Sequence, residues 1–248
     1  MTNIAINGFF GKMGQAILLE SQNLNSCIVT VGSDKEELVN KNSKDNIVLT
    51  TDISKCAGVF DVVIDFSLPN SSLVVAKTCA DLNKPLVIGT TGFTEKELEQ
   101  ISNYSKKIPI LIAPNMSIGV NASFDAIATL SKLLPDYKVN ISETHHKNKV
   151  DSPSGTALKF ANVVCDARGG SLGDITNENC PITFQSFRKN TEIGLHTITF
   201  KGPADEIVFT HTADNRNIFA NGALRTAEWL AQQKPGYYNY KNYMESIQ

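Results

Sequence analysis

Five short apolar runs in the first 116 residues constrain the fold of this chain more than any other feature. They lie at Asn3–Gly8, Cys27–Val31, Asp61–Phe66, Pro85–Ile88 and Pro109–Ala113. Each run is nearly continuous, which is typical of a strand buried on both faces, and helical patterns begin between them at Lys12, Pro69 and Thr94. This alternation predicts an α/β fold with a Rossmann-like, doubly wound parallel sheet.

The pattern changes after residue 116. Helices are expected at about Asn121–Leu134 and at 154–166, with an extended run from Val139 between them. Three later segments alternate apolar and polar residues and are joined by short turns: Ile182–Arg188, Ile193–Phe200 and Glu206–Thr212. Such segments are typical of an antiparallel sheet. We therefore expect a second, C-terminal mixed α/β domain with a largely antiparallel sheet, before a last helix at Phe219–Gln233.

Charge and composition exclude several classes of partner. The 248 residues carry a formal net charge of −2, so no overall field attracts nucleic acid or an anionic membrane. No apolar run approaches the ~20 residues that span a bilayer, and Met1 leads into a strand pattern rather than a signal peptide. The five cysteines are scattered and odd in number, as in reduced cytoplasmic proteins. We expect a cytoplasmic protein without nucleic-acid or membrane partners.

A glycine-rich turn joins the first predicted strand to the first predicted helix. It reads Gly8-Phe9-Phe10-Gly11-Lys12-Met13-Gly14, and Phe10 stands where the strict dinucleotide motif has its middle glycine. A structural turn would give the same pattern, but helix N-termini also bind pyrophosphate. Gly89-Thr90-Thr91 and Ala113-Pro114-Asn115 end later strands at the same carboxyl edge, where such sheets bind ligands. Together these features predict a nicotinamide dinucleotide site.

Two residues bear on which dinucleotide is bound. Asp34 lies 20 residues beyond Gly14, at the end of the second strand, where a carboxylate would bind the ribose hydroxyls of NAD. Lys35 beside it would instead meet the 2′-phosphate of NADPH. NADH is the first expectation, and NADPH stays open.

The segment Glu143–Ala157 (ETHHKNKVDSPSGTA) gathers proton carriers and cations. Histidine is a general acid or base near neutral pH, and Lys149 would hold a hydride acceptor and donate a proton to its imine or enamine nitrogen. Ser154, Gly155 and Thr156 open a helix whose N–H groups would bind a carboxylate. These features predict a small acidic substrate, a dicarboxylate.

Two plainer interpretations of this segment compete with a catalytic one. A run of charges is most often a solvated loop. A zinc site would use His145, His146, His196 or His211, but their spacing matches no zinc motif and the cysteines are not clustered nearby. We therefore expect no metal.

The same segment resembles the signature of the 4-hydroxy-tetrahydrodipicolinate reductase (dihydrodipicolinate reductase) family, bacterial enzymes of diaminopimelate and lysine synthesis. The likeness extends nearly from end to end of the chain. It includes the Gly8–Gly14 turn, Asp65-Phe66-Ser67, Gly89-Thr90-Thr91-Gly92-Phe93, Ala113-Pro114-Asn115-Met116-Ser117 and Phe219-Ala220-Asn221-Gly222-Ala223. Phe9, Phe10 and Leu68 depart from the family's pattern, which bears on how the cofactor binds.

The resemblance implies NAD(P)H-dependent reduction of 4-hydroxy-2,3,4,5-tetrahydrodipicolinate to tetrahydrodipicolinate with loss of water. His145 would be the catalytic histidine and Lys149 the proton donor, and His146, Gly155 and Thr156 would join Ser154 in binding substrate. NADH or NADPH would contact Gly8, Phe9, Phe10, Gly11, Lys12, Met13, Asp34, Lys35, Gly89, Thr90, Thr91, Ala113, Pro114, Asn115 and Met116. Residues 1–116 with 217–248 would bind the dinucleotide, and residues 117–216 would bind substrate and build a homotetramer.

Two other functions are open to a chain with a nicotinamide site. One is another two-domain dehydrogenase that acts on an amino-acid semialdehyde or a sugar. Its acylating form needs a nucleophilic cysteine, and no cysteine lies in the segment 143–157. The other is a non-catalytic redox sensor that binds NAD(H), which has no need of Lys149.

Overall fold

The chain folds into two compact units. The computed structural model describes residues 1–44, 46–147, 149, 151–173, 175, 180–189 and 192–247. The first unit consists of Met1–Ile118 together with Asn217–Gln248, and the second unit is Gly119–Arg216. Among the described residues, no helix combines the length and the apolar character that a bilayer crossing requires.

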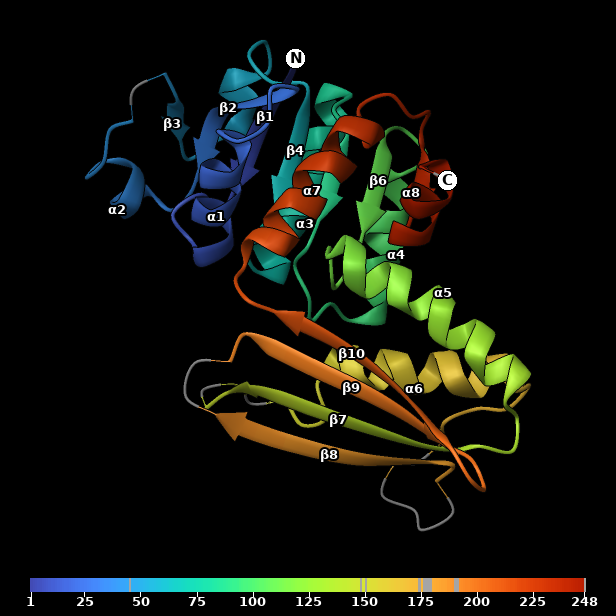
Figure 1. Cartoon of the computed structure of the whole chain (residues 1–248). Coiled ribbons are helices and arrows are strands. Elements are labelled where there is room, and N and C mark those ends of the chain that lie inside the picture. Colours follow the sequence, from blue (N-terminus) through green and yellow to red (C-terminus); the bar gives the residue numbers. More distant parts are fainter. Residues whose placement is uncertain are drawn as a thin grey trace. The chain divides into compact units, whose positions relative to one another are not determined.

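A parallel sheet forms the centre of the first unit (Figure 1). Its seven strands in the described part of the chain lie in the order β11 (Gly236–Tyr238), β6 (Pro109–Ile112), β5 (Leu86–Ile88), β4 (Val62–Asp65), β1 (Thr2–Asn7), β2 (Cys27–Ser33) and β3 (Val48–Thr50). From the central strands β1 and β4, the sheet extends through β2 and β3 on one side and through β5 and β6 on the other. This order confirms the Rossmann-like sheet and places its switch point at the carboxyl ends of β1 and β4.

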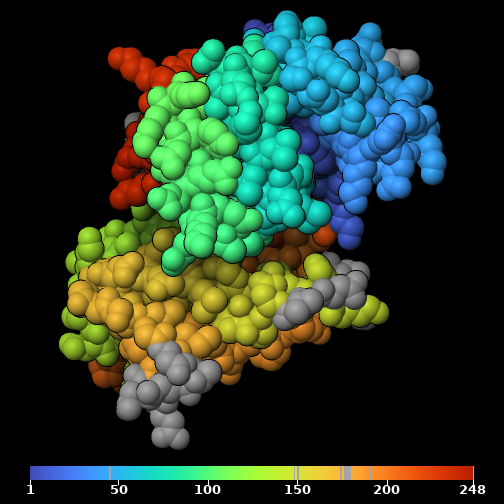
Figure 2. All heavy atoms as spheres, turned by 180° about the vertical axis from the view of Figure 1, so that it is seen from behind, coloured from blue at the N-terminus to red at the C-terminus, as the bar shows by residue number. Residues whose placement is uncertain are grey.

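Helices cover both faces of this sheet because successive residues of a strand point to opposite sides. The described helices of the first unit are α1 (Lys12–Ser21), α2 (Glu36–Val39), α3 (Pro69–Leu82), α4 (Glu95–Tyr104), α7 (Asn217–Leu230) and α8 (Tyr240–Ser246), with a short 3-10 helix η1 (Ile53–Cys56). Ile4 and Ile6 of β1 share an apolar cluster with α1 and α7, whereas Ala5 packs in a second cluster with α3 and α4. Figure 2 shows this second face closed over by residues of α3 and α4.

Local sequence signals set where two of these helices begin. Pro69 occupies the first position of α3. Thr94 forms a capping box at the start of α4: its hydroxyl accepts the Glu97 N–H at 3.3 Å, and the Glu97 carboxylate accepts the Thr94 N–H at 2.6 Å. Both helix starts confirm the sequence predictions.

The tyrosine-rich segment after α7 forms structure that its sequence pattern did not indicate. β11 pairs in parallel with β6 and extends the sheet by one edge strand. Tyr240 of α8 donates its hydroxyl proton to the Met116 carbonyl oxygen at 2.8 Å. A three-residue strand is too short for a periodic pattern to reveal it.

The second unit contains a mixed sheet, in the order β10 (Glu206–Ala213), β9 (Gly194–Lys201), β7 (Lys138–His146) and β8 (Ile182–Lys189). One apolar cluster joins this sheet to α5 (Ile118–Leu133) and α6 (Gly155–Ala167). β9 runs antiparallel to both β7 and β10, so the sheet is largely antiparallel, as predicted.

One expectation for this sheet was wrong. The segments 182–188, 193–200 and 206–212 do not form one antiparallel series, because β7 lies between β8 and β9, and β8 runs parallel to β7. The alternation of residues shows which face of a sheet each side chain occupies, but it does not show which strand lies next to which.

Gly222 of α7 marks a close approach between helix and backbone. A Cβ on Gly222 would overlap the Met116 carbonyl oxygen, which already accepts the Tyr240 hydroxyl. We expect Gly222→Ala to lower the free energy of unfolding by about 1–3 kcal/mol, the usual range for overpacking, in urea titrations followed by circular dichroism. Gly58→Ala is the matched control, because a Cβ there would meet nothing within 4 Å. Equal losses in both variants would contradict the close approach.

Candidate functional site

The Gly8–Gly14 turn follows β1 at the switch point of the first sheet. Gly8 has a φ of 77°, and a Cβ there would lie 2.6 Å from the Phe66 carbonyl oxygen. Gly11 is the N-cap of α1 and offers no side-chain acceptor to the helix. Lys12 is exposed and Met13 is half-buried in the first turn. The turn thus has the backbone geometry of helix N-termini that bind phosphates.

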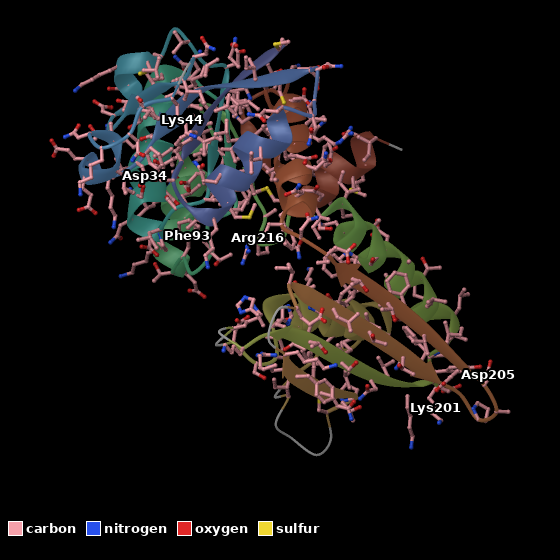
Figure 3. The ribbon with its side chains drawn as sticks, turned by 60° about the vertical axis from the view of Figure 1, so that its left-hand side comes forward. Asp34, Lys44, Phe93, Lys201, Asp205 and Arg216 are labelled. Atoms are coloured by element: carbon pink, nitrogen blue, oxygen red, sulfur yellow. The ribbon has the colours of Figure 1, made fainter. Side chains whose placement is uncertain are left out.

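The two phenylalanines of this turn have different surroundings. The Phe9 ring is fully buried, and a Cβ on Gly32 would lie 2.6 Å from it, so the ring points into the core of the unit. Phe10 is half-buried, and its N–H donates to the Asp34 carboxylate at 2.8 Å. Asp34 follows β2 in the first unit (Figure 3), and its other oxygen accepts the N–H of the exposed Lys35 at 2.8 Å. The structure therefore brings the turn and Asp34 together.

Asp65 is a buried carboxylate that sequence reasoning did not single out as a site residue. It accepts from Asn7 Nδ2 at 2.6 Å, from Ser67 Oγ at 2.6 Å and from Thr90 Oγ1 at 3.0 Å, and also from the Ser72 hydroxyl. These donors come from β1, from α3 and from the segments after β4 and β5. Asp65 thus joins the strand ends at the switch point, and the hydroxyl of Thr90 is committed to that network.

The other predicted cofactor residues follow β5 or β6 at their carboxyl ends. Because these strands are parallel neighbours of β4, the residues reach the same edge of the sheet as the Gly8–Gly14 turn. Their exposure differs: Thr91 and Pro114 are exposed, Gly89 and Asn115 are half-buried, and Ala113 and Met116 are buried.

In the second unit, β7 carries Glu143 and His145 on one face of the sheet, because residues two apart in a strand point to the same side. Glu143 is in register with His196 of β9 and Ser186 of β8, and His145 is in register with Arg188 of β8. Sequence reasoning singled out His145 but missed Glu143 and Arg188, and it gave His196 no role in chemistry. The spacing of two between Glu143 and His145 was the available signal.

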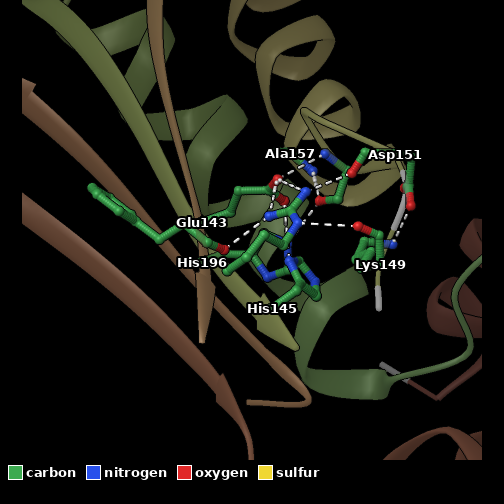
Figure 4. Close-up of polar contacts among 9 residues, drawn as sticks. Glu143, His145, Lys149, Asp151, Ala157 and His196 are labelled. Atoms are coloured by element: carbon green, nitrogen blue, oxygen red, sulfur yellow. Dashed lines mark hydrogen bonds and ion pairs between the residues drawn. The ribbon is translucent and has the colours of Figure 1, made fainter. Parts of the chain in front are cut away.

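Glu143 is the centre of a buried polar group (Figure 4). Its Oε2 lies 3.3 Å from His145 Nδ1, and its Oε1 accepts the Ser154 N–H at 3.1 Å and lies 3.3 Å from Arg188 Nη2. Burial alone would raise the pKa of the Glu143 carboxyl, but the interactions with His145 and Ser154 outweigh burial and hold this pKa well below its usual range. The carboxylate is therefore ionised in the interior.

His196 is neutral at physiological pH. Burial first, and then the nearby His145, lower the pKa of His196 to about 4. Its Nε2 lies 3.2 Å from Ser154 Oγ, and its ring meets that of His145 edge-on with centroids 5.0 Å apart. A neutral ring beside His145 leaves Glu143 as the charged partner of that histidine.

Glu143, His145 and His196 offer ligand atoms that lie within 4.8 Å of one another, a donor set that suits a metal ion. Two observations favour a different use of these atoms. Arg188 already lies against the Glu143 carboxylate, and its charge disfavours a second cation there. Ser154 contacts both the carboxylate and the His196 ring.

Lys149 and Asp151 lie in the segment between β7 and α6. Lys149 Nζ is 2.8 Å from Asp151 Oδ1 (Figure 4). Burial alone would raise the pKa of the Asp151 carboxyl. Hydrogen bonds from Lys149 and from the Gly155 N–H outweigh burial and hold this pKa below its ordinary value. The Asp151 carboxylate thus joins Lys149 to the first residue of α6. Asn148 and Val150 of the same segment lie outside the described residues.

The remaining predicted substrate residues differ in their surroundings. Ser154 is buried and is the N-cap of α6, where its hydroxyl accepts the Ala157 N–H at 3.2 Å. Gly155 is exposed, and Thr156 is half-buried in the first turn of α6. His146 is half-buried, and strand alternation turns its side chain to the face opposite His145. The structure thus gathers His145, Ser154 and the start of α6, but not His146, on one face.

Comparison with known protein families covers nearly the whole chain. The family model described as "Dihydrodipicolinate reductase, N-terminus" matches residues 2–116, and "Dihydrodipicolinate reductase, C-terminus" matches residues 119–244. A curated relative from Buchnera aphidicola subsp. Schizaphis graminum is named 4-hydroxy-tetrahydrodipicolinate reductase. It is 35% identical over 266 residues, which cover 99% of this chain and 97% of the relative.

Two solved structures share the fold. The dipicolinate-bound dihydrodipicolinate reductase from Paenisporosarcina sp. TG-14 has a TM-score of 0.81 at 24% identity, over 96% of this chain and 97% of that one. A myo-inositol dehydrogenase from Corynebacterium glutamicum ATCC 13032 has a TM-score of 0.61 at 12% identity, over 95% of this chain and 90% of that one. The fold is therefore shared with enzymes of more than one substrate.

The neutral His196 makes stability depend on pH. Its pKa is about 4 in the folded protein against an ordinary value of 6.5, so the unfolded chain binds the proton first as the pH falls. The free energy of unfolding therefore drops between about pH 6.5 and pH 4, and we expect this residue to contribute about 2 kcal/mol of loss between pH 7 and pH 5.

His196→Gln is expected to lose correspondingly less stability over that interval, measured by urea unfolding at both pH values. Burial also lowers the pKa of His211, but His211 is present in both proteins and cancels in the comparison. A variant with the pH dependence of the unchanged protein would contradict a buried, neutral His196.

Proposed function

The chain belongs to the dihydrodipicolinate reductase family, and we propose how its residues perform the reaction of that family. The chain is an oxidoreductase of diaminopimelate and L-lysine synthesis that reduces 4-hydroxy-2,3,4,5-tetrahydrodipicolinate to tetrahydrodipicolinate with loss of water. The observation that carries this assignment is the match of both halves of the chain to the family, with 35% identity to a relative along 99% of its length.

We assign the cofactor, NADH or NADPH, to residues 1–116 with 217–248. The Gly8–Gly14 turn supports this, because it lies at the switch point of a Rossmann-like sheet and leads into the N-terminus of α1. Asp34, held beside the turn by the Phe10 N–H, would bind the ribose hydroxyls of NADH. The exposed Lys35 would bind the 2′-phosphate of NADPH.

We assign the substrate, a small dicarboxylate, to residues 117–216. The Asp151 carboxylate already lies between Lys149 and the start of α6, so this position accepts an anion. The substrate would bind through the same cation and helix N-terminus, with Gly155 and Thr156 in the first turn. The expected contact from the His146 side chain is not part of this site, because that side chain lies on the opposite face of β7. Support for a dicarboxylate also comes from the reductase of Paenisporosarcina sp. TG-14, which was solved with dipicolinate bound.

One hydride and one proton convert the substrate to the product and release one water. A nicotinamide cofactor supplies the hydride when it is bound. The Lys149 ammonium donates the proton and balances the negative charge of the substrate. His145 has its Nδ1 turned to the Glu143 carboxylate, which leaves Nε2 for proton exchange, as in other carboxylate–histidine pairs.

Turnover distinguishes this function from the alternatives. The protein is mixed with NADH and the condensation product of pyruvate and aspartate semialdehyde, and the loss of NADH absorbance is followed. No turnover above the blank by folded protein would remove the reductase activity and leave an NAD(H)-binding sensor. Turnover with an amino-acid semialdehyde or a sugar alone would favour another two-domain dehydrogenase.

A cytoplasmic homotetramer is the assembly that we propose. All five cysteines are free, which suits a reducing compartment. On the sheet face opposite α5 and α6, Phe187 is 48% exposed and Val208 is 52% exposed. Exposed apolar side chains on a sheet face favour its use in pairing subunits.

Removing the amine of Lys149 tests its role. We expect Lys149→Ala to lower kcat by about 10²–10⁴-fold, the usual contribution of a general acid, while NADH binding measured by fluorescence persists. Lys147→Ala, on the exposed side of the same segment, is the matched control and should leave kcat unchanged. An unimpaired Lys149→Ala would make that lysine an ordinary surface charge.

Cofactor preference depends on Asp34 and Lys35 in opposite directions. Asp34→Asn removes the charge that binds ribose hydroxyls and repels a 2′-phosphate, so the ratio of kcat/KM for NADH to that for NADPH should fall by about 10-fold or more. Lys35→Ala should raise the same ratio. The two ratios are measured with each cofactor in turn, and a shift of both variants in one direction would contradict these roles.

A further inference from the structure

We propose that Arg188 is a positioning residue that holds the backbone carrying Lys149, and that Glu143 is the anchor that fixes Arg188. The inference rests on the proposed function, because the position of Lys149 matters only if that lysine is the proton donor. The Arg188 side chain contacts the main chain of Lys149, so the effect of Arg188 on the reaction passes through Lys149.

The Arg188 guanidinium joins strand β8 to the segment between β7 and α6. Its Nε donates to the Lys149 carbonyl oxygen at 3.3 Å, and its Nη2 donates to the Asp151 carbonyl oxygen at 2.6 Å. Nη1 donates to the carbonyl oxygen of Phe187, its neighbour in β8, at 2.8 Å. A planar group with five N–H donors in a fixed arrangement sets the positions of all three carbonyls relative to one another.

The Glu143 carboxylate also holds the Arg188 guanidinium in place. Arg188 Nη1 and Nη2 lie 3.4 Å and 3.3 Å from Glu143 Oε1. The Glu143 side chain is 1% exposed and that of Arg188 is 22% exposed, so little water competes for this pair. Because the same carboxylate contacts His145, one buried charge positions both predicted catalytic residues: His145 directly and Lys149 through Arg188.

The test is whether the effect of Arg188 depends on Lys149. Arg188→Met is made in the unchanged protein and in Lys149→Ala, and kcat is measured at saturating NADH and substrate. We expect a fall of about 10²-fold in the unchanged protein, the scale for misplacing a catalytic group by about 1 Å. In Lys149→Ala we expect less than a threefold further fall, roughly, because residues that act as a unit are non-additive.

Arg168→Met is the matched control. Arg168 also donates to two backbone carbonyls of the second unit, those of Leu134 at 2.8 Å and Tyr137 at 2.9 Å. Its replacement should lower the unfolding temperature and leave kcat within about threefold of the unchanged protein. If Arg188→Met does not fold, Arg188→Lys is tested in the same two backgrounds. It keeps the charge but not the fork of donors, and it should lower kcat only where Lys149 is present.

Several results would overturn the inference. An equal loss of kcat in both backgrounds would mean that Arg188 acts independently of Lys149. If Arg188→Met leaves kcat unchanged in the protein that retains Lys149, Arg188 has no positioning role. A higher KM for substrate with unchanged kcat would make Arg188 a direct substrate contact instead. Failure of the proposed function is distinguishable, because the unchanged protein would then show no turnover.

Discussion

An ionised carboxylate is stable inside a protein only where protein groups replace the water it has lost. Glu143 meets this condition with three partners in the second unit: Arg188 of β8, His145 of its own strand β7 and the Ser154 N–H before α6. All of these partners have to be in place at once. The need to compensate one charge therefore fixes how two strands and a helix N-terminus meet around His145.

In the first unit the Asp65 carboxylate has a place comparable to that of Glu143, but its partners differ in chemistry. Asp65 is also buried at the end of a strand, but its donors are an amide and three hydroxyls, all neutral. Neutral donors join the strand ends without adding charge to the edge where the dinucleotide is expected to bind. Glu143 instead shares its charge with an arginine and a histidine, the residues for which we propose the positioning of Lys149 and the exchange of protons.

The sequence predicted the parts of the molecule that depend on local signals. The start of α3 at Pro69, the start of α4 after Thr94 and the Gly8–Gly14 turn all follow from neighbouring residues. The parallel pairing of β8 with β7 did not, because pairing depends on distant segments that a pattern of alternation does not identify. Arg188 was missed for the same reason: it lies 45 residues from Glu143, and only strand register brings the two residues together.

The first unit is built from two stretches of chain with the whole second unit between them. Ile4 and Ile6 of its first strand share a core with Ala223 and Leu224 of α7. During synthesis on the ribosome, α7 emerges about 5–20 s after the front stretch if translation proceeds at ordinary rates over the 98 residues from 119 to 216. For that interval the part of this sheet face that α7 covers, over β4, β5 and β6, stays exposed, while the continuous second unit is already able to fold. That part of the face is the surface on which a holding chaperone would act.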